Sequence, residues 1–583
     1  MGRARTLLVD RGGALAIATL VLYVVIAPDH IVNGENADFV ATGSLGGIPH
    51  PSGYPLYSMW LRAWSVLPLP PAHAFAIATA MLSPLLVLSL HAACRAWGAR
   101  PAVATAAVAM FVTGPIVLRI HTEVEVFALN GVVTACIVWL AAERGPVTGQ
   151  RRVAALCLVA GLGLANHLTC VLLAPVGILG VARGIRESTT RGRAIALGAV
   201  ALVAGLLPYL YLYVAPSTSV SWGEVTSIGD LARHALRFDY GAFQFAAKGE
   251  ELYPLANAGA LASTTLRAYL FVPSALGGIA VGLALLGRQR GDTRAGWWML
   301  VATWVLAGPL LVLRFNLAPE GIDRYVVERF HLQSLTLFAV FVAAGIDRAF
   351  DYWKRPTPRL VGGALAATAF VVGAALSLPD LSRKHSPAVE QGLRNLLATM
   401  PPAAIVIGTP DDLHFGMGYL QSVLGIRLDV TIISTSQLGL PYYRDRLKAR
   451  TGFVVEKPGP GETVTANIAK QALATGRPVF IDTFQANIAG AFPIYPYGIL
   501  FRVLPLGSTV PSLDEIFEIN RDVFARYRFG YAFPGPNDFH ATRWHELYAR
   551  VWASMSAGLA QAGRAEDAAF ARSLALELAP RAE

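Results

Sequence analysis

A series of long apolar runs in the first two-thirds of the chain limits its fold more than any other feature. Several runs are long enough to cross a hydrocarbon layer about 30 Å thick, which takes about 20 helical residues. The 583 residues are 54% hydrophobic but only 15% charged, whereas a soluble domain has about 25% charged residues. An ordinary soluble enzyme or a disordered chain is excluded, because neither keeps so much apolar surface from water. We predict an α-helical polytopic membrane protein.

Eleven apolar runs are predicted to span the membrane. They are residues 13–28, 73–94, 101–118, 126–142, 153–166, 168–183, 194–213, 266–287, 296–313, 332–347 and 360–378. The fifth and sixth runs are short for full spans. They form either a tight hairpin with Asn166 and His167 at its tip or one pair of long tilted helices. No small-x-small cleavage site follows the first run, so we do not expect a cleaved signal peptide.

Basic residues predict the orientation. Arginine and lysine gather at the N-terminus and in every second loop, and cytoplasmic loops carry such an excess. Examples are Arg3, Arg5, Arg11, Arg95, Arg100, Arg151, Arg152, Arg186, Arg288, Arg290, Arg348 and Lys354. The N-terminus is therefore predicted to be cytoplasmic. The alternate loops (29–72, 119–125, 214–265 and 314–331) and the chain after residue 379 are predicted to face outward. The net charge of +10 then reflects orientation rather than a nucleic-acid partner.

The first outer loop contains the first candidate site residues. Polar groups beside membrane spans are costly to place, so they point to function. Glu35 and Asp38 are three residues apart, which puts both carboxylates on one face if the segment is helical. The run GIPHPSGYP (47–55), with His50 and Tyr54, is predicted to be fixed and non-helical. Such backbone at membrane depth is tolerated mainly around a cavity. The structural alternative is a solvated loop with a capping aspartate.

Two further outer segments carry polar residues. Glu123 and Glu125 are two residues apart and do not share a face on a helix, so at most one is predicted to point inward. Asn166 and His167 lie at the predicted hairpin tip. A lone histidine there is more often packed and hydrogen-bonded than a ligand. These four residues are candidate substrate contacts.

The large outer loop and the start of the tenth run complete the candidate set. Residues 219–245 have part of an amphipathic pattern, which predicts a helix along the membrane surface. Trp222 and Tyr240 either anchor that helix or contact substrate, and Arg237 is suited to an anionic head group. Arg329 places another cation on the outer side, and guanidinium offers paired donors to phosphate. Carboxylates, imidazoles and arginines on one side favour an active site for a phosphate-bearing substrate over a pore.

The sequence does not indicate a metal ion, a nucleotide or a nucleic acid as a ligand. The sequence has no His-x-x-x-His or Cys-x-x-Cys pair, and its outer acidic and histidine residues lie on separate loops, so a divalent metal is not predicted. It also has no Walker-type loop and no basic stripe interleaved with aromatic residues. Nucleotide hydrolysis and nucleic-acid binding are therefore not predicted.

Five segments stand out by their order and spacing. They are GENADFVATGSLGGIPHPSGYPLYSMW, EVEVFALN, GLGLANHLT, LLPYLYLYV and SWGEVTSIGDLARHALRFDYGAF. Together they resemble a family of polytopic proteins whose eukaryotic member is a protein O-mannosyltransferase of the secretory pathway that acts on IPT domains. The resemblance covers roughly residues 15–350, and its most specific parts are HPSGYPLY and SWG…DYGAF.

This resemblance implies a GT-C glycosyltransferase fold, in which a multi-span helical domain has an outward-facing active site. Such enzymes take a sugar from a polyprenyl-phosphate carrier, and their first outer loop typically carries an acidic base. Here that base would be Asp38, with Glu35 beside it. The usual Asp-Ser-Gly-Glu of the family is Glu35-Asn36-Ala37-Asp38, so the two acids are exchanged. The usual His-Pro-Pro-Gly is His50-Pro51-Ser52-Gly53.

The implied reaction is transfer of the sugar to an extracytoplasmic acceptor hydroxyl, most simply protein O-mannosylation. Asp38 would take the hydroxyl proton. Arg329 or Arg237, together with His50, would hold the departing lipid phosphate. A single displacement inverts the anomeric centre. The resemblance thus implies a lipid-linked sugar donor and a protein or glycan acceptor as partners, at a bacterial inner membrane.

From about residue 385 the composition is that of a soluble module. A strand in 403–412, a helix in 413–424 and strands in 429–434 and 477–483 predict an α/β module with a mostly parallel sheet. Asp411 and Asp412 follow the first strand, a usual ligand position, but lack a convincing partner in the sequence.

The end of the chain completes the predicted domain organisation. Residues 552–580 look like one tetratricopeptide-type helix pair with Gly563 at the turn, which needs a neighbour to bury its apolar face. The predicted domains are 1–379 (transmembrane), 380–510 (α/β) and 511–583 (helical).

A transporter or flippase of lipid-linked saccharides is the alternative function. It would place polar residues along the spans near the midplane and show repeated halves. Neither feature is found, because the polar residues gather at one side of the predicted spans. The sequence therefore favours a glycosyltransferase.

Overall fold

The computed structural model describes residues 11–238, 251–352, 359–456 and 463–581. The chain divides into two compact units, and each is described by itself. The first comprises Met1–Asp29, Pro51–Ala215 and Val225–Ser382, and the second comprises His30–His50, Pro216–Glu224 and Arg383–Glu583. Two segments predicted as outer loops, 30–50 and 216–224, therefore belong to the same unit as the C-terminal region. The predicted domain boundaries stay a prediction.

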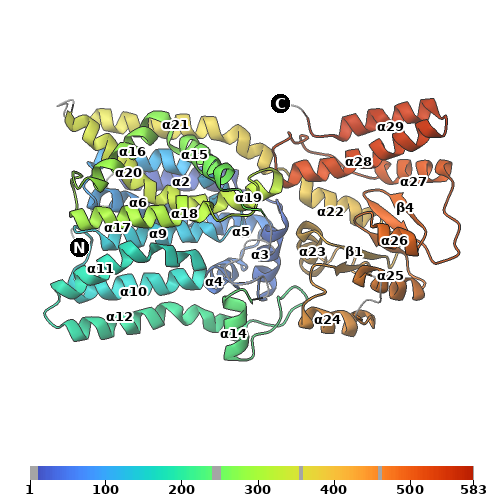
Figure 1. Cartoon of the computed structure of the whole chain (residues 1–583), viewed down its shortest axis with the longest axis horizontal. Helices are drawn as coiled ribbons and strands as arrows, with labels where there is room; N and C mark the ends of the chain where they lie inside the picture. Colours follow the sequence, from blue (N-terminus) through green and yellow to red (C-terminus); the bar gives the residue numbers. More distant parts are fainter. Residues whose placement is uncertain (1–10, 239–250, 353–358, 457–462, 582–583) are drawn as a thin grey trace. The chain divides into compact units, whose positions relative to one another are not determined.

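The first unit is helical in its described residues (Figure 1). Its helices are α2 (Arg11–Ile26), α4 (Pro55–Trp64), α5 (Pro71–Ala80), α6 (Ser83–Ala96), α7 (Pro101–Thr113), α8 (Pro115–Thr122), α9 (Phe127–Ala141), α10 (Gly149–Asn166), η1 (Leu168–Leu173), α11 (Ala174–Glu187), α12 (Arg191–Leu206), η2 (Leu207–Leu210), α13 (Tyr211–Val214), α14 (Ile228–Ala235), α15 (Pro254–Tyr269), α16 (Phe271–Leu285), α17 (Arg294–Ala307), α18 (Pro309–Val312), α19 (Gly321–Arg329), α20 (His331–Tyr352) and α21 (Arg359–Lys384).

Membrane-spanning helices of the predicted kind are present. Within the described residues, six helical segments are long and apolar enough to cross a membrane, and two bent pairs raise the number to eight if each pair is one span. The apolar helices Gly12–Ile26 and Phe127–Ala141 are shorter. The predicted total of eleven spans stays a prediction.

Two runs predicted as single straight spans are bent. α7 and α8 meet at an angle of 67°, because α7 ends at the residues before Pro115 and a residue before proline disfavours the helical conformation. α15 and α16 meet at 114° around Leu270, whose φ is +62°. The eighth run, predicted from residue 266, therefore begins in one helix and continues in another.

The fifth and sixth apolar runs form two adjacent helices joined by a turn, and the choice between a tight hairpin and a pair of long tilted helices stays a prediction. α10 and α11 pack against each other, and the chain between them turns at Asn166 and His167. α12 lies along the opposite side of α10 (Figure 1). Their backbones approach closely at two glycines, since a Cβ on Gly205 would lie 2.4 Å from the carbonyl oxygen of Leu158. Small residues at such crossings are typical of helix packing in membranes.

The second unit contains a five-stranded sheet with strand order β2-β1-β3-β5-β4. The strands are β1 (Ile405–Gly408), β2 (Thr431–Ser434), β3 (Val479–Ile481), β4 (Ile494–Tyr497) and β5 (Leu500–Val503). β1 pairs in parallel with β2 and β3, whereas β5 pairs antiparallel with β3 and β4. The predicted parallel pairing is thus confirmed for β1, β2 and β3. The antiparallel β4–β5 hairpin was not predicted, because both strands are only four residues long and β4 contains Pro496.

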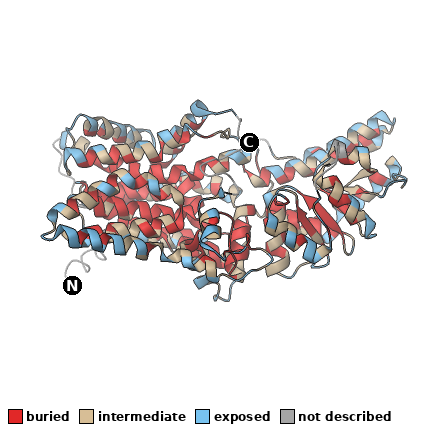
Figure 2. Cartoon of the chain, turned by 60° about the horizontal axis from the view of Figure 1, so that its bottom comes forward, coloured by how far each residue is buried: buried red, intermediate tan, exposed pale blue. Residues whose placement is uncertain are grey.

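Helices surround this sheet. They are α3 (Gly34–Leu45), α22 (Ala388–Thr399), α23 (Asp411–Gly418), the π-helix η4 (Tyr419–Val423), α24 (Pro441–Thr451), α25 (Val464–Ala474), α26 (Ala486–Ala491), α27 (Leu513–Ala525), α28 (His540–Gln561) and α29 (Ala565–Leu578). The apolar side chains of β1, β2 and β3 form the core with α25. Figure 2 shows these strands, and the interior of the helical unit, as buried.

The last two helices form an antiparallel pair. α28 and α29 pack along each other, and the turn between them contains Gly563 at φ +74°. α28 also contacts α22, where the Trp544 ring lies against Gly392 so closely that a Cβ there would be 2.4 Å from Trp544 Cε3. The pair therefore buries part of its surface against the rest of the second unit.

Candidate functional site

The first candidate residues lie on α3, whose ends are set by local sequence. Asn33 caps the helix, because its side-chain oxygen accepts a hydrogen bond from the backbone N–H of Asn36 at 2.8 Å. The helix ends at Gly46, which adopts φ +82° and donates to the carbonyl of Thr42. The chain from residue 46 to 54 then has no helix or strand, as predicted. Glu35 and Asp38 are therefore on a helix, as the spacing required.

Asp38 and His50 form a buried pair in the second unit. Asp38 Oδ2 lies 2.6 Å from His50 Nδ1 and accepts the backbone N–H of His50 at 3.0 Å. Asp38 is 1% exposed and His50 is 8% exposed. The loop after α3 thus returns to the helix and holds one carboxylate oxygen from two directions.

The other oxygen of Asp38 is able to accept a further hydrogen bond. Within the described residues, Asp38 Oδ1 has no hydrogen-bond partner, and neither does the side-chain amide of Asn36. Both groups are buried, and a buried polar group without a partner costs free energy. A substrate hydroxyl is a group that would satisfy them, since a carboxylate accepts a hydroxyl proton and an amide both donates and accepts.

Aromatic side chains surround the His50 ring. Phe39, Trp222 and Phe415 have ring centroids 5.4, 6.5 and 6.4 Å from it. The backbone N–H of Trp222 donates to the carbonyl of Ile48 at 2.9 Å, which holds the segment 216–224 against the loop that carries His50. Trp222 therefore lies at the candidate site. Of the two predicted alternatives for Trp222, anchoring a surface helix is not favoured, because the described helix of that segment, α14, begins only at Ile228.

Carboxylates of α23 lie close to those of α3. Burial of the carboxyl group and then the charges of Glu35 and Asp412 raise the pKa of Asp411 to about 6, and Asp38 adds to this effect. Glu35 is half-buried, whereas part of Asp411 reaches the surface. The charge of Asp411 thus changes near pH 6 beside the candidate site.

Asp412 joins the first outer segment to the C-terminal region within the second unit. Its Oδ1 accepts the backbone N–H of Gly34 at 2.7 Å, and its Oδ2 lies 2.8 Å from His540 Nδ1. Burial by itself would raise the pKa of Asp412, but the His540 imidazole and the Gly34 N–H bring it below its usual value. No partner for Asp412 could be predicted, because both partners are more than 100 residues away along the chain.

The first unit contains a separate cluster of charged residues. Glu123 Oε2 accepts from the hydroxyl of Tyr325 at 3.0 Å, and Glu125 Oε2 lies 3.5 Å from Arg329 Nη1. Both glutamates are buried, so the prediction that at most one points inward is wrong. The reason is local. α8 ends at Thr122, and extended backbone at Glu123 replaces the helical periodicity on which that prediction depended.

The same cluster continues through arginine and aromatic contacts. Arg119 Nη2 lies 3.6 Å from Glu328 Oε2, and its guanidinium stacks over the Tyr325 ring at 4.4 Å. The Arg329 guanidinium lies 5.8 Å from the ring centroid of Phe127. Opposite charges therefore face each other across α8, α9 and α19, which is how buried charges are accommodated.

His167 sits in an aromatic cluster of the first unit. Its ring stacks on Tyr54 with a centroid distance of 5.7 Å and lies 4.5 Å from the Phe127 ring. His167 Nδ1 accepts the backbone N–H of Thr169 at 3.2 Å, which caps the η1 helix. Asn166 Nδ2 donates to the carbonyl of Val126 at 3.3 Å. The structure thus brings together Tyr54, Glu123, Glu125, Asn166, His167 and Arg329 in one unit.

Two predicted site residues are not joined to these clusters by the contacts described above. Arg237 follows α14, is half-buried and has φ +60°. Tyr240 lies outside the described residues. Their predicted roles in substrate binding stay predictions.

Sequence reasoning missed several residues of the two clusters. Asn36 stands between the two predicted carboxylates, and only the buried, unpartnered state of its amide marks it. Tyr325 precedes Arg329 by four residues, and this helical spacing could have placed both on one face. Phe415 and His540 gave no signal, because their neighbours are far away in sequence. In the part of the chain that the structure describes, no three His, Cys, Asp or Glu residues are grouped so as to hold a metal ion.

Comparison with known proteins matches this chain to one family of membrane proteins. Residues 36–190 match the family described as the N-terminal domain of the protein O-mannosyl-transferase TMEM260. The mouse protein O-mannosyl-transferase TMEM260 is 25% identical over 469 residues, which are 75% of this chain and 64% of that protein. The Dictyostelium discoideum protein of the same name is 21% identical over 375 residues, 58% of this chain and 45% of that protein. The predicted resemblance is confirmed, although the chain spans less than two thirds of either relative.

A solved structure is also similar. The crystal structure of ArnT from Cupriavidus metallidurans bound to undecaprenyl phosphate aligns with 86% of this chain and 99% of that chain. The sequence identity is 12% and the TM-score is 0.38.

Proposed function

We propose that the protein is a membrane glycosyltransferase that moves a sugar from a polyprenyl-phosphate carrier to an acceptor hydroxyl, with protein O-mannosylation as the reaction. One observation supports it most directly. Asp38 is a buried carboxylate with one oxygen held by His50 and the other, Oδ1, without a partner in the described chain. The similarity to named protein O-mannosyl-transferases supports the reaction class.

In this reaction Asp38 acts as the base. The acceptor hydroxyl gives its proton to Asp38 Oδ1 while its oxygen attacks the anomeric carbon of the donor. The bond between that carbon and the phosphate oxygen breaks, and the electron pair leaves with the lipid phosphate. One displacement inverts the anomeric centre. A positioned base of this kind contributes about 10²–10⁴-fold to the rate.

The neighbours of Asp38 suit this role. His50 fixes the carboxylate through Oδ2, so that Oδ1 keeps one direction. Asn36 offers an amide to the acceptor or the sugar. Asp412 is less suited, because both of its oxygens are already engaged by Gly34 and His540. Glu35 is half-buried on the same helix, and its predicted catalytic role remains part of the proposal.

The other parts of the proposal come from the sequence. The donor phosphate would be held by Arg329 or Arg237. The remaining substrate contacts would be Tyr54, Glu123, Glu125, Asn166, His167, Trp222 and Tyr240. We also propose that the second unit faces outward from a bacterial inner membrane, where the acceptor is found.

The test is sugar transfer by purified full-length protein from a radiolabelled polyprenyl-phosphate sugar to a Ser/Thr-containing peptide. Asp38→Asn keeps the shape of the side chain but removes the base, and we expect a rate loss of at least about 10²-fold. Asp522→Asn is the matched control, because Asp522 is exposed on α27 and has no part in the site. Transfer by Asp38→Asn at the rate of the control would disprove the assignment of the base. Absence of transfer by the wild type with every polyprenyl-phosphate sugar would count against the enzyme class.

A further inference from the structure

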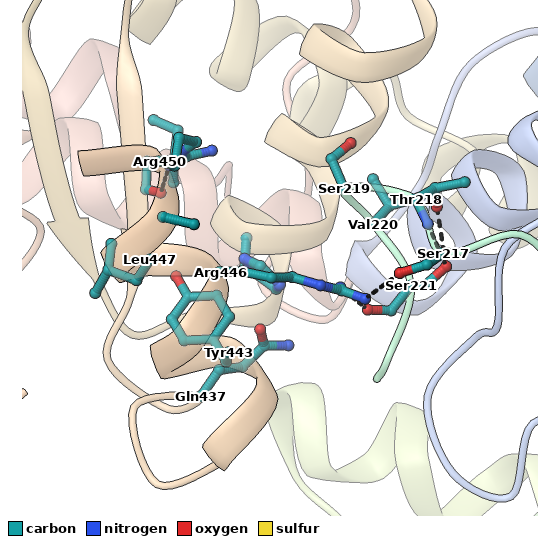
Figure 3. Close-up of a pocket in the computed structure, with 13 residues that line it drawn as sticks. Ser217, Thr218, Ser219, Val220, Ser221, Gln437, Tyr443, Arg446, Leu447 and Arg450 are labelled. Atoms are coloured by element: carbon teal, nitrogen blue, oxygen red, sulfur yellow. Dashed lines mark hydrogen bonds between the residues drawn. The ribbon is translucent and has the colours of Figure 1, made fainter. Parts of the chain in front are cut away.

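A pocket of about 460 Å³ lies in the second unit, between the segment 216–224 and α24 (Figure 3). We call it the α24 pocket. One wall is formed by residues 217–221, and the other by Tyr443, Arg446 and Arg450. His414 and Gln437 complete its polar lining. Its volume is within the range of about 300–1,000 Å³ that is common for ligand sites.

The lining of the α24 pocket contains two arginines and no carboxylate, and Glu224 is linked to Arg446 only through the Ser217 hydroxyl, which donates to Glu224 Oε1 at 2.5 Å. Figure 3 shows the Arg446 side chain reaching from α24 toward Ser217 and Ser221. Its guanidinium donates to the carbonyl of Ser221 and, at 3.2 Å, to Ser217 Oγ. Arg450 Nη2 donates to the carbonyl of Ile432 at 2.9 Å. Within the described residues neither arginine forms an ion pair, since their hydrogen bonds go to neutral oxygens.

The charge of the pocket therefore favours an anion. Burial and the neighbouring Arg450 lower the pKa of His414 to about 4, so this imidazole is neutral at pH 7 and adds no cation. The pKa of Arg450 is itself lowered, first by burial and further by the positive charge of Arg477. A carboxylate from a ligand would offset the positive charge of these two arginines.

The pocket is joined to the Asp38 site by two pairs of consecutive residues. Ser221 lines the pocket, while the next residue, Trp222, lies against His50. His414 lines the pocket, while the next residue, Phe415, contacts both His50 and Trp222. The segments that line the pocket therefore also contact the His50 ring, each through the neighbouring aromatic residue.

We propose that the α24 pocket binds an acidic segment of the acceptor polypeptide, close to the Ser or Thr that Asp38 deprotonates. This inference rests on the proposed glycosyltransferase function. The bound segment would place a carboxylate side chain beside Arg446 and Arg450. The residues next to that acidic residue would contact the apolar side chains of Leu447 and Ile432.

A polypeptide fits these walls better than a neutral saccharide does. A neutral sugar has no charge to offer two arginines, whereas an acidic peptide supplies both a carboxylate and apolar side chains. The lining also contains no tryptophan, and Tyr443 uses its hydroxyl to accept the backbone N–H of Ser434 at 2.7 Å. The pocket thus combines charge and apolar surface in the way that suits side chains of a peptide.

The test measures peptide binding separately from sugar transfer. Fluorescence anisotropy with the full-length protein compares a labelled Ser/Thr peptide that carries Asp and Glu with the same peptide carrying Asn and Gln. Arg450→Gln removes one cation, and we expect the Kd of the acidic peptide to rise about tenfold, with the neutral peptide unaffected. Lys448→Gln is the matched control, because it removes the same charge from an exposed position of α24 outside the pocket.

A second variant keeps the test independent of the folding of Arg450→Gln. Gln437→Glu adds a carboxylate inside the pocket without removing an arginine, and it should weaken the acidic peptide by a similar factor. In the transfer assay both variants should raise KM for the acidic peptide and leave kcat unchanged, whereas Asp38→Asn lowers kcat.

The outcomes separate the two proposals. Equal binding of acidic and neutral peptides by the wild type, or equal weakening by Arg450→Gln and Lys448→Gln, would overturn the inference even if the enzyme transfers sugar. Binding of an acidic oligosaccharide but not of the acidic peptide by the wild type would also overturn the inference, since the pocket would then select a glycan. Charge-selective peptide binding that Arg450→Gln removes would support the pocket even in a protein that fails to transfer sugar.

Discussion

Two clusters of buried polar residues, one in each unit, differ in how their charges are balanced. In the first unit, Glu123 faces the Tyr325 hydroxyl, and Glu125 faces Arg329. In the second unit, Asp38 uses one oxygen for His50, and its other oxygen has no partner in the described chain. Both clusters are made of the residue types that sequence analysis selects. The comparison teaches that the two clusters differ in the partner of the buried carboxylate: a guanidinium faces Glu125, whereas an imidazole and a backbone N–H hold Asp38.

This difference gives the two clusters different expected roles. Charges that meet their opposites in a buried site position helices, and breaking such a pair is costly. A carboxylate that is held on one side and open on the other is positioned for proton transfer. Substitutions in the first unit should therefore change stability in addition to any loss of the proposed substrate contacts, and substitutions around Asp38 should change rate first.

Glu125→Gln is expected to have the largest effect. It removes the negative charge facing Arg329, where both groups are buried, and should lower the free energy of unfolding by about 3 kcal/mol. Thermal unfolding of the full-length protein in detergent measures this change. Adding Arg329→Gln should restore part of the loss, because it removes the remaining cation. A variant that loses transfer but keeps its stability would break the comparison and support the predicted role of Glu125 in substrate binding.

His50→Gln sharpens the description of the second cluster. The glutamine keeps the backbone N–H contact but not the short contact of Asp38 Oδ2 with the imidazole, so the carboxylate loses its fixed direction. We expect kcat to fall about 10²-fold while KM changes little, since misplacement of a reacting group costs about that much. An unchanged kcat would show that His50 has only a structural role.

Gly34→Ala tests how the second cluster is supported. A Cβ at this position would lie 2.6 Å from the backbone of Asp411, so α3 or α23 must move. We expect a loss of about 2 kcal/mol in stability, as for overpacking at other close contacts. Gly229→Ala is the control, because a Cβ there meets no atom closer than 3.5 Å. Equal melting temperatures of the two variants would contradict the close packing of α3 on α23.

Asp411→Asn should have the smallest effect, and its sign depends on pH. The folded pKa of Asp411, about 6, is above its ordinary value of 3.8, so protonation stabilises the folded state below pH 3.8. That contribution is lost as the pH rises through 6. The variant should therefore lose less stability than the wild type between pH 4 and pH 7. Because part of Asp411 is exposed, water screens its charge and the step is small. Melting temperatures of the wild type and Asp411→Asn that change equally between pH 4 and pH 7 would contradict the raised pKa.

Much of the architecture could be predicted from the sequence because it depends on local patterns. Apolar runs predicted membrane helices, and the helical spacing of Glu35 and Asp38 predicted that they share a face. Valine- and isoleucine-rich runs predicted the strands β1, β2 and β3. Patterns failed where the periodicity was interrupted. The break after Thr122 turned both Glu123 and Glu125 inward, and the break at Leu270 divided one predicted span.

By itself, the sequence determined the membrane class and the carboxylates to examine, since each depends on residues within a few turns of one another. Only the tertiary structure decided that Asp412 engages Gly34 and His540, and that Trp222 and Phe415 lie against His50. It also decided which oxygen of Asp38 has no hydrogen-bond partner within the described residues. The physical reason is that these contacts join segments far apart in the chain. Their partners depend on how the whole unit packs rather than on any periodicity that a single segment carries.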